Sequence, residues 1–515
     1  MHKDNVYTGD EARAKLMVGV NVVADAVKGT LGAGGYNALL QDPRPPYSIA
    51  TNDGVSVARS IYLADPVENI GANLMKEIGQ KSDKDGGDGT TTSITLAQAI
   101  LQGGLSATAS PMEVKRSLEE CLPIIIKSID AQTKEITVDD VGRVATISSE
   151  NEDMGRLIQE VYTKIGKDGI LYTDISKTAE DYYTLGKGVK VEDAALASAY
   201  MADTDNAGNF VKTSAIKNPQ ILLTKQRISS AMEINTIVTE LYNKGIKELV
   251  IFCDEIEATV IPDLVMTRAK SGFRTVVIRM PVLWKDHWFE DLALLTGATV
   301  VDPVQGVGFK ELKSFHLGTC DSILADKTDT YLEGTRDIAE YIAKLDAGDD
   351  EDKLRAARLN TKSARLFVGA PTESALSYKR LKLEDARNAA YQALHGGVVA
   401  GGGVALRNAA KEMPDTIGGN ILREALVAPM HQIMTNAIGE KVGKTIVDEP
   451  NVGFDAKTMD MVDMHEAGII DPAKIVKNAI TNAISVASVV LSTKVIVTLP
   501  QNEEGKTISA QQQLI

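Results

Sequence analysis

The sequence predicts a mixed fold, in which a mostly helical part built from both ends of the chain carries an inserted α/β part. Three observations lead to this prediction. The first and last thirds carry apolar residues at helical spacing, as in residues 11–31 and 475–491. The middle alternates short apolar strands with helices, which is typical of an α/β domain. The length of 515 residues is enough for about three domains.

The individual elements follow in order from these patterns. In the first third, helices are expected over residues 11–31, 66–80, 91–101 and 112–128, with Ser110 as the cap of the last one. In the middle, strands are expected at 248–253, 274–279 and 298–302, with helices at 257–270 and 285–296. In the last third, helices are expected at 383–394, 404–411, 422–438 and 475–491. Helical ends around an α/β centre indicate that one domain is inserted in another.

Composition and charge exclude several classes of protein. The chain has 55 Lys and Arg residues against 70 Asp and Glu, a net charge of −15 and 5% aromatic residues, which argues against a nucleic-acid-binding protein. Its three cysteines lie far apart and its six histidines lack metal-ligand spacing, so we expect reduced thiols and no structural zinc. No apolar leader follows the first residues, and no stretch approaches the ~20 apolar residues of a membrane span. A cytoplasmic protein that does not enter a membrane is therefore expected.

A glycine-rich segment before a helix carries the strongest functional signal. Residues 86–92 read GGDGTTT and run directly into the helix that starts near Ser93. Glycines let the backbone come close to an anion, and a helix start offers unpaired N–H groups and the positive end of its dipole. Asp88 would repel phosphate unless Mg²⁺ lay between them. The pattern therefore favours a nucleotide phosphate site over the alternative, a simple capped helix.

Two further loops and three carboxylates are weaker candidates for the same site. Residues 30–35 (TLGAGG) end a helix and residues 399–404 (VAGGGV) open one, and glycine caps alone would explain either loop. Asp53 lies in a turn sequence, Asp385 lies in a helix where an exposed polar face would explain it, and Asp471 precedes a proline as a helix cap would. Spacing alone makes none of these carboxylates catalytic.

One segment imitates a phosphate-binding P-loop. Residues 439–445 read GEKVGKT, but only three residues separate the two glycines, where the motif requires four. The segment also follows a predicted helix and not a strand. A P-loop is therefore rejected.

Several long motifs occur in order along the chain. They are the opening DEARAKLMVGVNVVADAVKGTLG, TNDGVSVARSI at 51–61, GDGTTTSITLAQAI at 87–100, GVVAGGGVAL at 397–406 and GIIDPAK at 468–474. Together they strongly resemble the group I chaperonins, the GroEL family. The resemblance covers essentially the whole chain, is dense at both ends and is thinner in the middle.

The resemblance implies three domains and an ATP-driven protein-folding machine. Residues 1–136 and 397–515 would form an equatorial domain that binds ATP and forms the ring, residues 137–192 and 364–396 an α/β intermediate hinge, and residues 193–363 an apical domain that binds clients. Family members assemble heptameric rings, usually two stacked back to back, around a cavity in which a non-native polypeptide folds. The implied cofactors are ATP and Mg²⁺, and family analogy suggests K⁺ bound largely through backbone oxygens.

Site residues carry over from the family position by position. Asp88 would hold Mg²⁺. Asp385, from the hinge, would position or deprotonate the attacking water, and Asp53 would assist. Gly402 and Asp471 would flank the base and ribose. The other nucleotide contacts are expected from Thr30, Leu31, Gly32, Asn52, Gly89, Thr90, Thr91, Thr92, Asp455 and Ala456.

The sequence also departs from the family pattern. Ala33 stands where proline is usual, Asn52 where lysine is usual and Asp455 where asparagine is usual. The sequence MPVLWKDHW at 280–288 replaces the usual sequence after the second apical strand, and the Gly-Gly-Met tail is missing. Among these departures, the replaced apical sequence puts recognition of a lid co-chaperonin in doubt. A phage or a distant bacterial lineage would account for them, and the location would then be the cytoplasm of the phage's host.

Client binding is expected on two apical helices that each have an apolar face. The residues are Ile234, Ile237, Val238, Leu241, Val260, Ile261, Leu264 and Val265. Ordinary core packing of amphipathic helices is the alternative explanation for them. Two other functions stay open: a chaperonin-derived holdase or scaffold that does not cycle productively, and an unrelated small-molecule ATPase or kinase.

Overall fold

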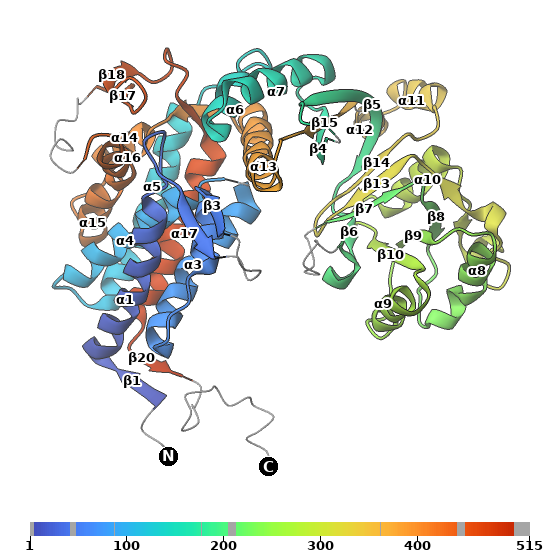
Figure 1. Cartoon of the computed structure of the whole chain (residues 1–515), viewed down its shortest axis with the longest axis horizontal. Coiled ribbons are helices and arrows are strands. Elements are labelled where there is room, and N and C mark those ends of the chain that lie inside the picture. The colour runs from blue at the N-terminus through green and yellow to red at the C-terminus, as the bar shows by residue number, and fades with distance from the viewer. Residues whose placement is uncertain are drawn as a thin grey trace. The chain divides into compact units, whose positions relative to one another are not determined.

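The chain folds into two units, one of them inserted in the other (Figure 1). The computed structural model describes residues 5–41, 48–86, 88–176, 178–203, 213–360, 362–439 and 449–498. Unit 1 comprises Met1–Lys167, Ile175–Asp181 and Val368–Ile515, and unit 2 comprises Asp168–Asp174 and Tyr182–Phe367. The predicted mixed fold with an inserted α/β part is confirmed. The finer division into equatorial, hinge and apical domains stays a prediction.

Unit 1 is mainly helical, and long helices with apolar faces build its core. They are α1 (Gly9–Lys28), α3 (Pro66–Gly86), α4 (Thr90–Ser106), α5 (Pro111–Gln132) and α17 (Ala473–Ser492). α17, which comes from the C-terminal part of the chain, packs against α3, α4 and α5 from the N-terminal part. The predicted cap at Ser110 is present, because its hydroxyl accepts the Glu113 N–H at 3.3 Å. The two ends of the chain therefore share one hydrophobic core.

Helix α17 corrects one expectation from the sequence. Within the part of the chain that the structure describes, it is long and apolar enough, by length and composition, to cross a membrane. In the fold, 67% of that apolar window is buried inside the protein. Its Asn482 is also buried and donates to the hydroxyl of Ser82 at 3.2 Å. A helix that is apolar on most sides is expected in the interior of a large core, and this is the place that α17 occupies.

Shorter elements complete unit 1. The helices are α2 (Gly54–Ser60), α6 (Val141–Ser149), α7 (Glu152–Ile165), α13 (Glu373–Gly396), α14 (Val404–Lys411), α15 (Ile417–Ala425) and α16 (Ala428–Ile438). Two-stranded sheets pair β1 (Val6–Thr8) with β20 (Val495–Val497), β2 (Ala38–Gln41) with β3 (Ser48–Thr51), β16 (Val398–Ala400) with β19 (Ile470–Pro472), and β17 (Val452–Asp455) with β18 (Asp460–Asp463). The helix predicted over 422–438 is in fact two helices. Pro429 has no N–H to continue a helix, so it lies in the first turn of α16.

Unit 2 is α/β and contains two sheets. In the first, β8 (Gln220–Thr224), β9 (Glu248–Cys253), β10 (Arg274–Arg279) and β11 (Val300–Val301) are parallel, and β6 (Ala195–Leu196) and β12 (Gly318–Thr319) are antiparallel. Helices α8 (Ala231–Asn243), α9 (Val260–Ser271) and α10 (Lys285–Thr296) connect the parallel strands. The second sheet has the order β4 (Ile170–Ile175), β15 (Lys362–Val368), β5 (Tyr182–Val191), β14 (Thr330–Glu333), β13 (Ser322–Ala325) and β7 (Ser214–Lys217). Helices α11 (Ala339–Asp346) and α12 (Asp350–Leu359) precede β15.

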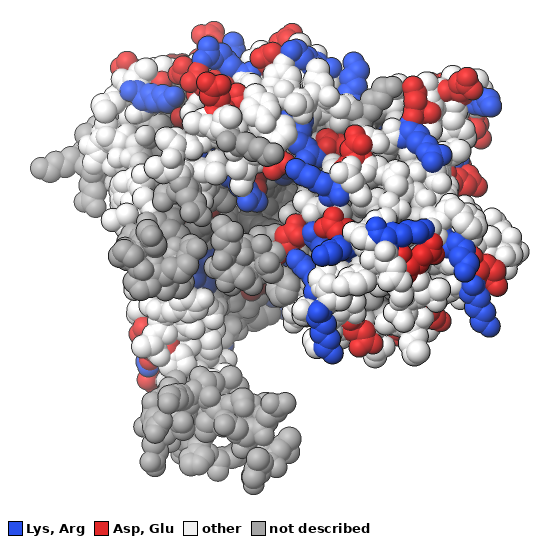
Figure 2. Space-filling model, turned by 45° about the vertical axis from the view of Figure 1, so that its right-hand side comes forward, with Lys and Arg blue, Asp and Glu red and all other residues white. Residues whose placement is uncertain are grey.

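The surface charge is mixed in sign. On the face shown in Figure 2, acidic and basic side chains are interspersed, and no large basic patch is visible there. Among the described residues on this face, no basic stripe is visible along which a phosphate backbone would run.

The three cysteines are free thiols inside the two units. Cys121 lies in the core of unit 1, and Cys253 and Cys320 lie in the core of unit 2. Burial raises the pKa of Cys253 and of Cys320 to about 12, and it also raises the pKa of Cys121. All three thiols are therefore unreactive while the fold is closed.

The apolar residues proposed for client binding lie in the core of unit 2. Six of the side chains are buried, namely Ile234, Ile237, Leu241, Val260, Ile261 and Leu264. Val238 and Val265 are partly buried against the same core. The faces of α8 and α9 that carry these residues belong to the same hydrophobic core as residues of β8, β9 and β10, as is usual for amphipathic helices of an α/β domain. Core packing, the alternative explanation, therefore accounts for these positions, and the residues do not form a surface that could hold a client.

A core role for α8 predicts a loss of stability when its apolar face is trimmed. Leu241→Ala should lower the free energy of unfolding by about 2–5 kcal/mol, because it leaves a cavity in a closely packed core. Urea unfolding of the full chain measures this change. Thr239→Ala, on the exposed side of the same helix, is the control and should change stability little. Unchanged stability with weakened client capture in Leu241→Ala would instead restore the client-binding role.

Candidate functional site

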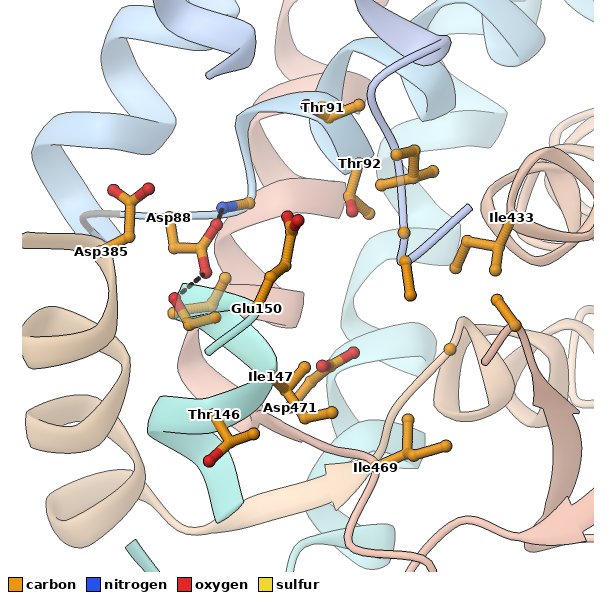
Figure 3. Close-up of a pocket in the computed structure, with 18 of the residues that line it drawn as sticks. Asp88, Thr91, Thr92, Thr146, Ile147, Glu150, Asp385, Ile433, Ile469 and Asp471 are labelled. Atoms are coloured by element: carbon orange, nitrogen blue, oxygen red, sulfur yellow. Dashed lines mark hydrogen bonds between the residues drawn. The ribbon is translucent and has the colours of Figure 1, made fainter. Parts of the chain in front are cut away.

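A cavity of about 910 Å³ in unit 1 brings the predicted nucleotide site together (Figure 3). Its walls come from segments that are far apart in the sequence, including the starts of α2, α4 and α14, the end of α6 and the middle of α13. Every nucleotide-site and catalytic residue expected from the sequence lines this one cavity: Thr30, Leu31, Gly32, Asn52, Asp53, Asp88, Gly89, Thr90, Thr91, Thr92, Asp385, Gly402, Asp455, Ala456 and Asp471. The P-loop imitation at 439–445 falls, after its first residue, outside the described residues.

The start of α4 gives the cavity a site suited to an anion. Gly89 caps this helix with a left-handed backbone (φ 85°), and the first bond inside the helix runs from the Ser93 N–H to the Gly89 carbonyl. The N–H groups of the three threonines before Ser93 therefore have no partner within the helix. A side chain at position 89 would come within 2.7 Å of Ile475, so glycine is required here for both conformation and space. Such a helix start binds phosphate or carboxylate groups readily.

The three threonines of this segment differ in what their hydroxyls do. The Thr90 side chain is buried and donates to the Gly79 carbonyl at 3.2 Å, so it ties α4 to α3. Thr91 and Thr92 line the cavity from the first turn of α4 (Figure 3). The expected hydroxyl contacts to phosphate therefore fall to Thr91 and Thr92, while Thr90 offers its backbone N–H.

The other two glycine loops form the opposite part of the cavity. Gly32 (φ 77°) and Gly402 (φ 61°) have left-handed backbones, which glycine adopts without strain. A side chain at position 402 would come within 3.0 Å of Met464, so there is little room for one. Because residue 402 is a glycine, no side chain covers the backbone at this point of the loop. Apolar side chains, among them Ile433 and Phe454, also line the cavity. The cavity thus combines a polar wall suited to phosphates with apolar groups suited to a flat base.

Asp88 is held in place beside the start of α4. One carboxylate oxygen accepts the Gly89 N–H, and the other accepts the Ser148 hydroxyl at 3.1 Å (Figure 3). Burial raises the pKa of the Asp88 carboxyl, and the negative charge of Asp53 raises it further. The two hydrogen bonds and the charge of Lys382 act in the opposite direction. This carboxylate is oriented but lacks a full counter-charge.

The carboxyl of Asp471 lies near that of Asp88, and within the described part of the chain no hydrogen bond to it offsets the effect of burial. The alternative explanation, a cap for α17, does not hold, because Pro472 is the N-cap residue and no side chain caps this helix. Burial raises the pKa of the Asp471 carboxyl to about 7, and the charge of Asp88 contributes to the shift. Within the described residues no group of three or more His, Cys, Asp and Glu side chains could hold a metal ion by itself. A pair of carboxylates that lacks a counter-charge fits Mg²⁺, which proteins usually hold with one or two carboxylates and the phosphates of the substrate.

Asp53 and Asp385 reach the cavity in different ways. Asp53 is the N-cap of α2, and its carboxylate accepts the N–H groups of Val55 at 3.1 Å and Ser56 at 3.0 Å. The turn suggested by its sequence is therefore a helix start. Asp385 is half-buried on α13 and lines the cavity, so it does not lie on an exposed polar face (Figure 3). These two carboxylates and Asp88 come from three separate segments and meet at one cavity.

Three residues of the cavity wall were missed by the sequence analysis. Ser148 on α6 binds Asp88, Lys382 on α13 forms an ion pair with Glu150 at 2.8 Å, and Glu150 connects α6 to α7. Lys382 could have been found, because it precedes Asp385 by three residues and a helix places both on one face. Nothing in the sequence around Ser148 or Glu150 marks them.

Comparison with known proteins identifies the family. The profile of the TCP-1/cpn60 chaperonin family matches residues 23–500. The chain belongs to this family. The group I resemblance of the motifs is thereby confirmed, for a divergent member.

Two solved structures are similar to this chaperonin along nearly its whole length. Both are crystal structures of the chaperonin gp146 from bacteriophage EL 2 (Pseudomonas aeruginosa), obtained in the presence of ATP-BeFx. Crystal form II has a TM-score of 0.74 at 18% sequence identity, and crystal form I has 0.67 at 19%. Each match covers 97% of this chain and 100% of the gp146 chain. At this identity the likeness establishes the chaperonin fold.

The raised pKa of Asp471 predicts how this group changes stability with pH. A carboxyl whose pKa is higher in the folded than in the unfolded chain costs stability as the pH rises from about 4 to 7, because the folded protein must give up a proton that it prefers to keep. Asp471→Asn should therefore raise the free energy of unfolding at pH 8 by about 1–4 kcal/mol without nucleotide, and most of this gain should vanish near pH 4. Urea unfolding at the two pH values measures it. Equal or lower stability of the variant at pH 8 would contradict this account.

Proposed function

We propose that this chaperonin is an ATPase that captures non-native proteins and promotes their folding inside a ring through ATP-driven domain movements. The supporting observation is the single cavity that unites an anion-binding helix start, glycine loops, an apolar part and a group of carboxylates. The alternative of an unrelated small-molecule ATPase or kinase does not explain why the chaperonin family profile matches residues 23–500. The site of action would be the cytoplasm.

Nucleotide binding would use the two parts of the cavity differently. The N–H groups at the start of α4 and the hydroxyls of Thr91 and Thr92 would bind the phosphates. Gly402 and the apolar side chains near it would receive the base. Asp88, oriented by Ser148, would hold Mg²⁺, which neutralises phosphate charge when it is bound. The gp146 structures, obtained with ATP-BeFx, support nucleotide binding in this fold. K⁺, held through backbone oxygens, stays part of the proposal by family analogy.

Hydrolysis would depend on Asp385 as the general base. Its carboxylate would accept a proton from the attacking water, since it lines the cavity and comes from a helix separate from the phosphate-binding segment. Asp53 would assist by accepting a hydrogen bond from the water, because the first turn of α2 already holds its carboxylate in place. A base delivered by a different segment couples hydrolysis to the movement of that segment.

Ring formation is supported by two small sheets with free edges. The β1–β20 and β2–β3 pairs have two strands each, and such pairs are marginally stable alone. They expose apolar side chains, with Leu39 77% exposed and Val497 63% exposed. Further copies of the chain would cover these side chains and extend the sheets. We propose a heptameric ring, single or double, on family analogy.

The base assignment gives the first test. Asp385→Ala should lower ATP turnover by about 10²–10⁴-fold, because general base catalysis contributes on this order. Phosphate release measures turnover, and light scattering should show the same assembly as the wild type. Glu384→Ala, whose side chain on the same helix pairs with Arg380, is the matched control and should keep its turnover. Unchanged turnover in Asp385→Ala would remove Asp385 from this role.

The refolding of a denatured client tests the function itself. With Mg²⁺ and ATP but no lid protein, the yield should rise well above the nucleotide-free control if the divergent apical part works without a separate lid. Capture of the client without recovery, also after a lid protein is added, would favour the alternative, a holdase or scaffold.

A further inference from the structure

The cavity is acidic, although the ligand proposed for it is a polyanion. Eight carboxylates line it, those of Asp53, Asp88, Glu150, Glu152, Asp385, Asp455, Glu466 and Asp471. The basic residues among its described walls are fewer, namely Arg143, Arg156, Lys382 and Lys457. A triphosphate bound here would meet repulsion from several sides, so the position of each cation decides how well it binds.

Of these four cations, Lys382 alone is buried. Arg143, Arg156 and Lys457 have exposed side chains, and Arg156 is paired with Asp153. Lys382 is only 9% exposed. Charges at an exposed position are screened by water and salt, whereas a buried ammonium interacts more strongly with a nearby phosphate. Lys382 is therefore the cation with the greatest effect on an anion in this cavity.

Lys382 acts electrostatically on the carboxylates of the site. Burial raises the pKa of Asp88, and the charge of Lys382 opposes this rise. Lys382 also lies three residues before Asp385 on α13. Burial alone would lower the pKa of Lys382, but the charge of Glu150 and its hydrogen bond outweigh burial, and the pKa is raised. The ammonium thus keeps its proton at neutral pH.

Glu150 holds this ammonium by a contact that can be exchanged. The Lys382 Nζ lies 2.8 Å from Glu150 Oε1, and the Asn52 amide donates to both Glu150 oxygens at 3.1 and 3.2 Å. Glu150 has a left-handed backbone (φ 56°) between α6 and α7, and its side chain is 39% exposed, against 11% for that of Lys382. The carboxylate can therefore be solvated by water when it releases the ammonium, and a phosphate can take its place beside Lys382.

We propose that Lys382 recognises the terminal phosphate of the nucleoside triphosphate, and that Glu150 holds the lysine until this phosphate replaces it. The exchange gives up one carboxylate contact and gains a contact with a more highly charged oxyanion. A diphosphate lacks the group that completes the exchange, so Lys382 distinguishes the substrate from the product. This inference rests on the proposed ATPase function.

Equilibrium binding of two nucleotides tests the inference. The probes are adenosine 5′-(β,γ-imido)triphosphate and ADP, each titrated calorimetrically into the full chain with Mg²⁺. Lys382→Met should weaken the triphosphate analogue by about 10- to 100-fold and change ADP affinity by less than about twofold. Lys382→Arg should recover part of the loss, because it keeps the charge. Lys379→Met is the matched control, since Lys379 lies on the same helix, pairs with Asp181 and does not line the cavity.

A second variant should change the affinity for the triphosphate analogue in the opposite direction. Glu150→Gln leaves Lys382 in place and removes its competing anion, so the triphosphate analogue should bind more tightly than to the wild type. Equal losses for both nucleotides in Lys382→Met, or no loss, would overturn the inference and leave the ATPase proposal standing. Weaker analogue binding in Glu150→Gln would overturn the exchange. A wild-type chain that binds neither nucleotide would overturn the ATPase proposal itself.

Discussion

The structure depends on the contact between the start of α4 and the carboxylate of Asp88. The helix start favours a negative group, and the Asp88 carboxylate accepts a hydrogen bond from the Gly89 N–H there. Gly89 makes this possible, because any side chain there would collide with Ile475 on α17. Burial raises the pKa of Asp471, and the nearby charge of Asp88 adds to this rise. Negative groups are therefore gathered next to a site that attracts anions, and the surrounding cations have to balance them.

The order of the chain explains how these groups reach one place. The cavity walls come from both ends of the sequence, with unit 2 inserted between them. Helix α17 packs against α3, α4 and α5, so the C-terminal part of the chain supports helix α4, whose start lines the cavity. Closing the cavity therefore requires contacts between residues hundreds of positions apart. Asp385 and Lys382 enter it on α13, directly after the chain returns from unit 2.

Much of the fold and most of the cavity could be predicted from the sequence, for identifiable reasons. Periodic apolar faces indicate α1, α4 and α5, and the glycines with Asp88 indicate the anion site, because these features act locally. Pairs of residues that meet only through the tertiary fold could not be predicted. The ion pair between Lys382 and Glu150 joins segments 232 positions apart. The apolar faces of α8 and α9 were misjudged for a related reason, since an amphipathic pattern does not say whether its partner is the protein's own sheet or another chain.

The buried cysteines have a consequence for following this protein in time. Each unit carries at least one thiol in its core, with Cys121 in unit 1 and Cys253 and Cys320 in unit 2. A thiol reagent can modify such a residue only after the surrounding structure opens. The rate of modification at each position therefore reports the opening of that unit separately, without any introduced label. The native chain can thus reveal whether its two units open together or independently.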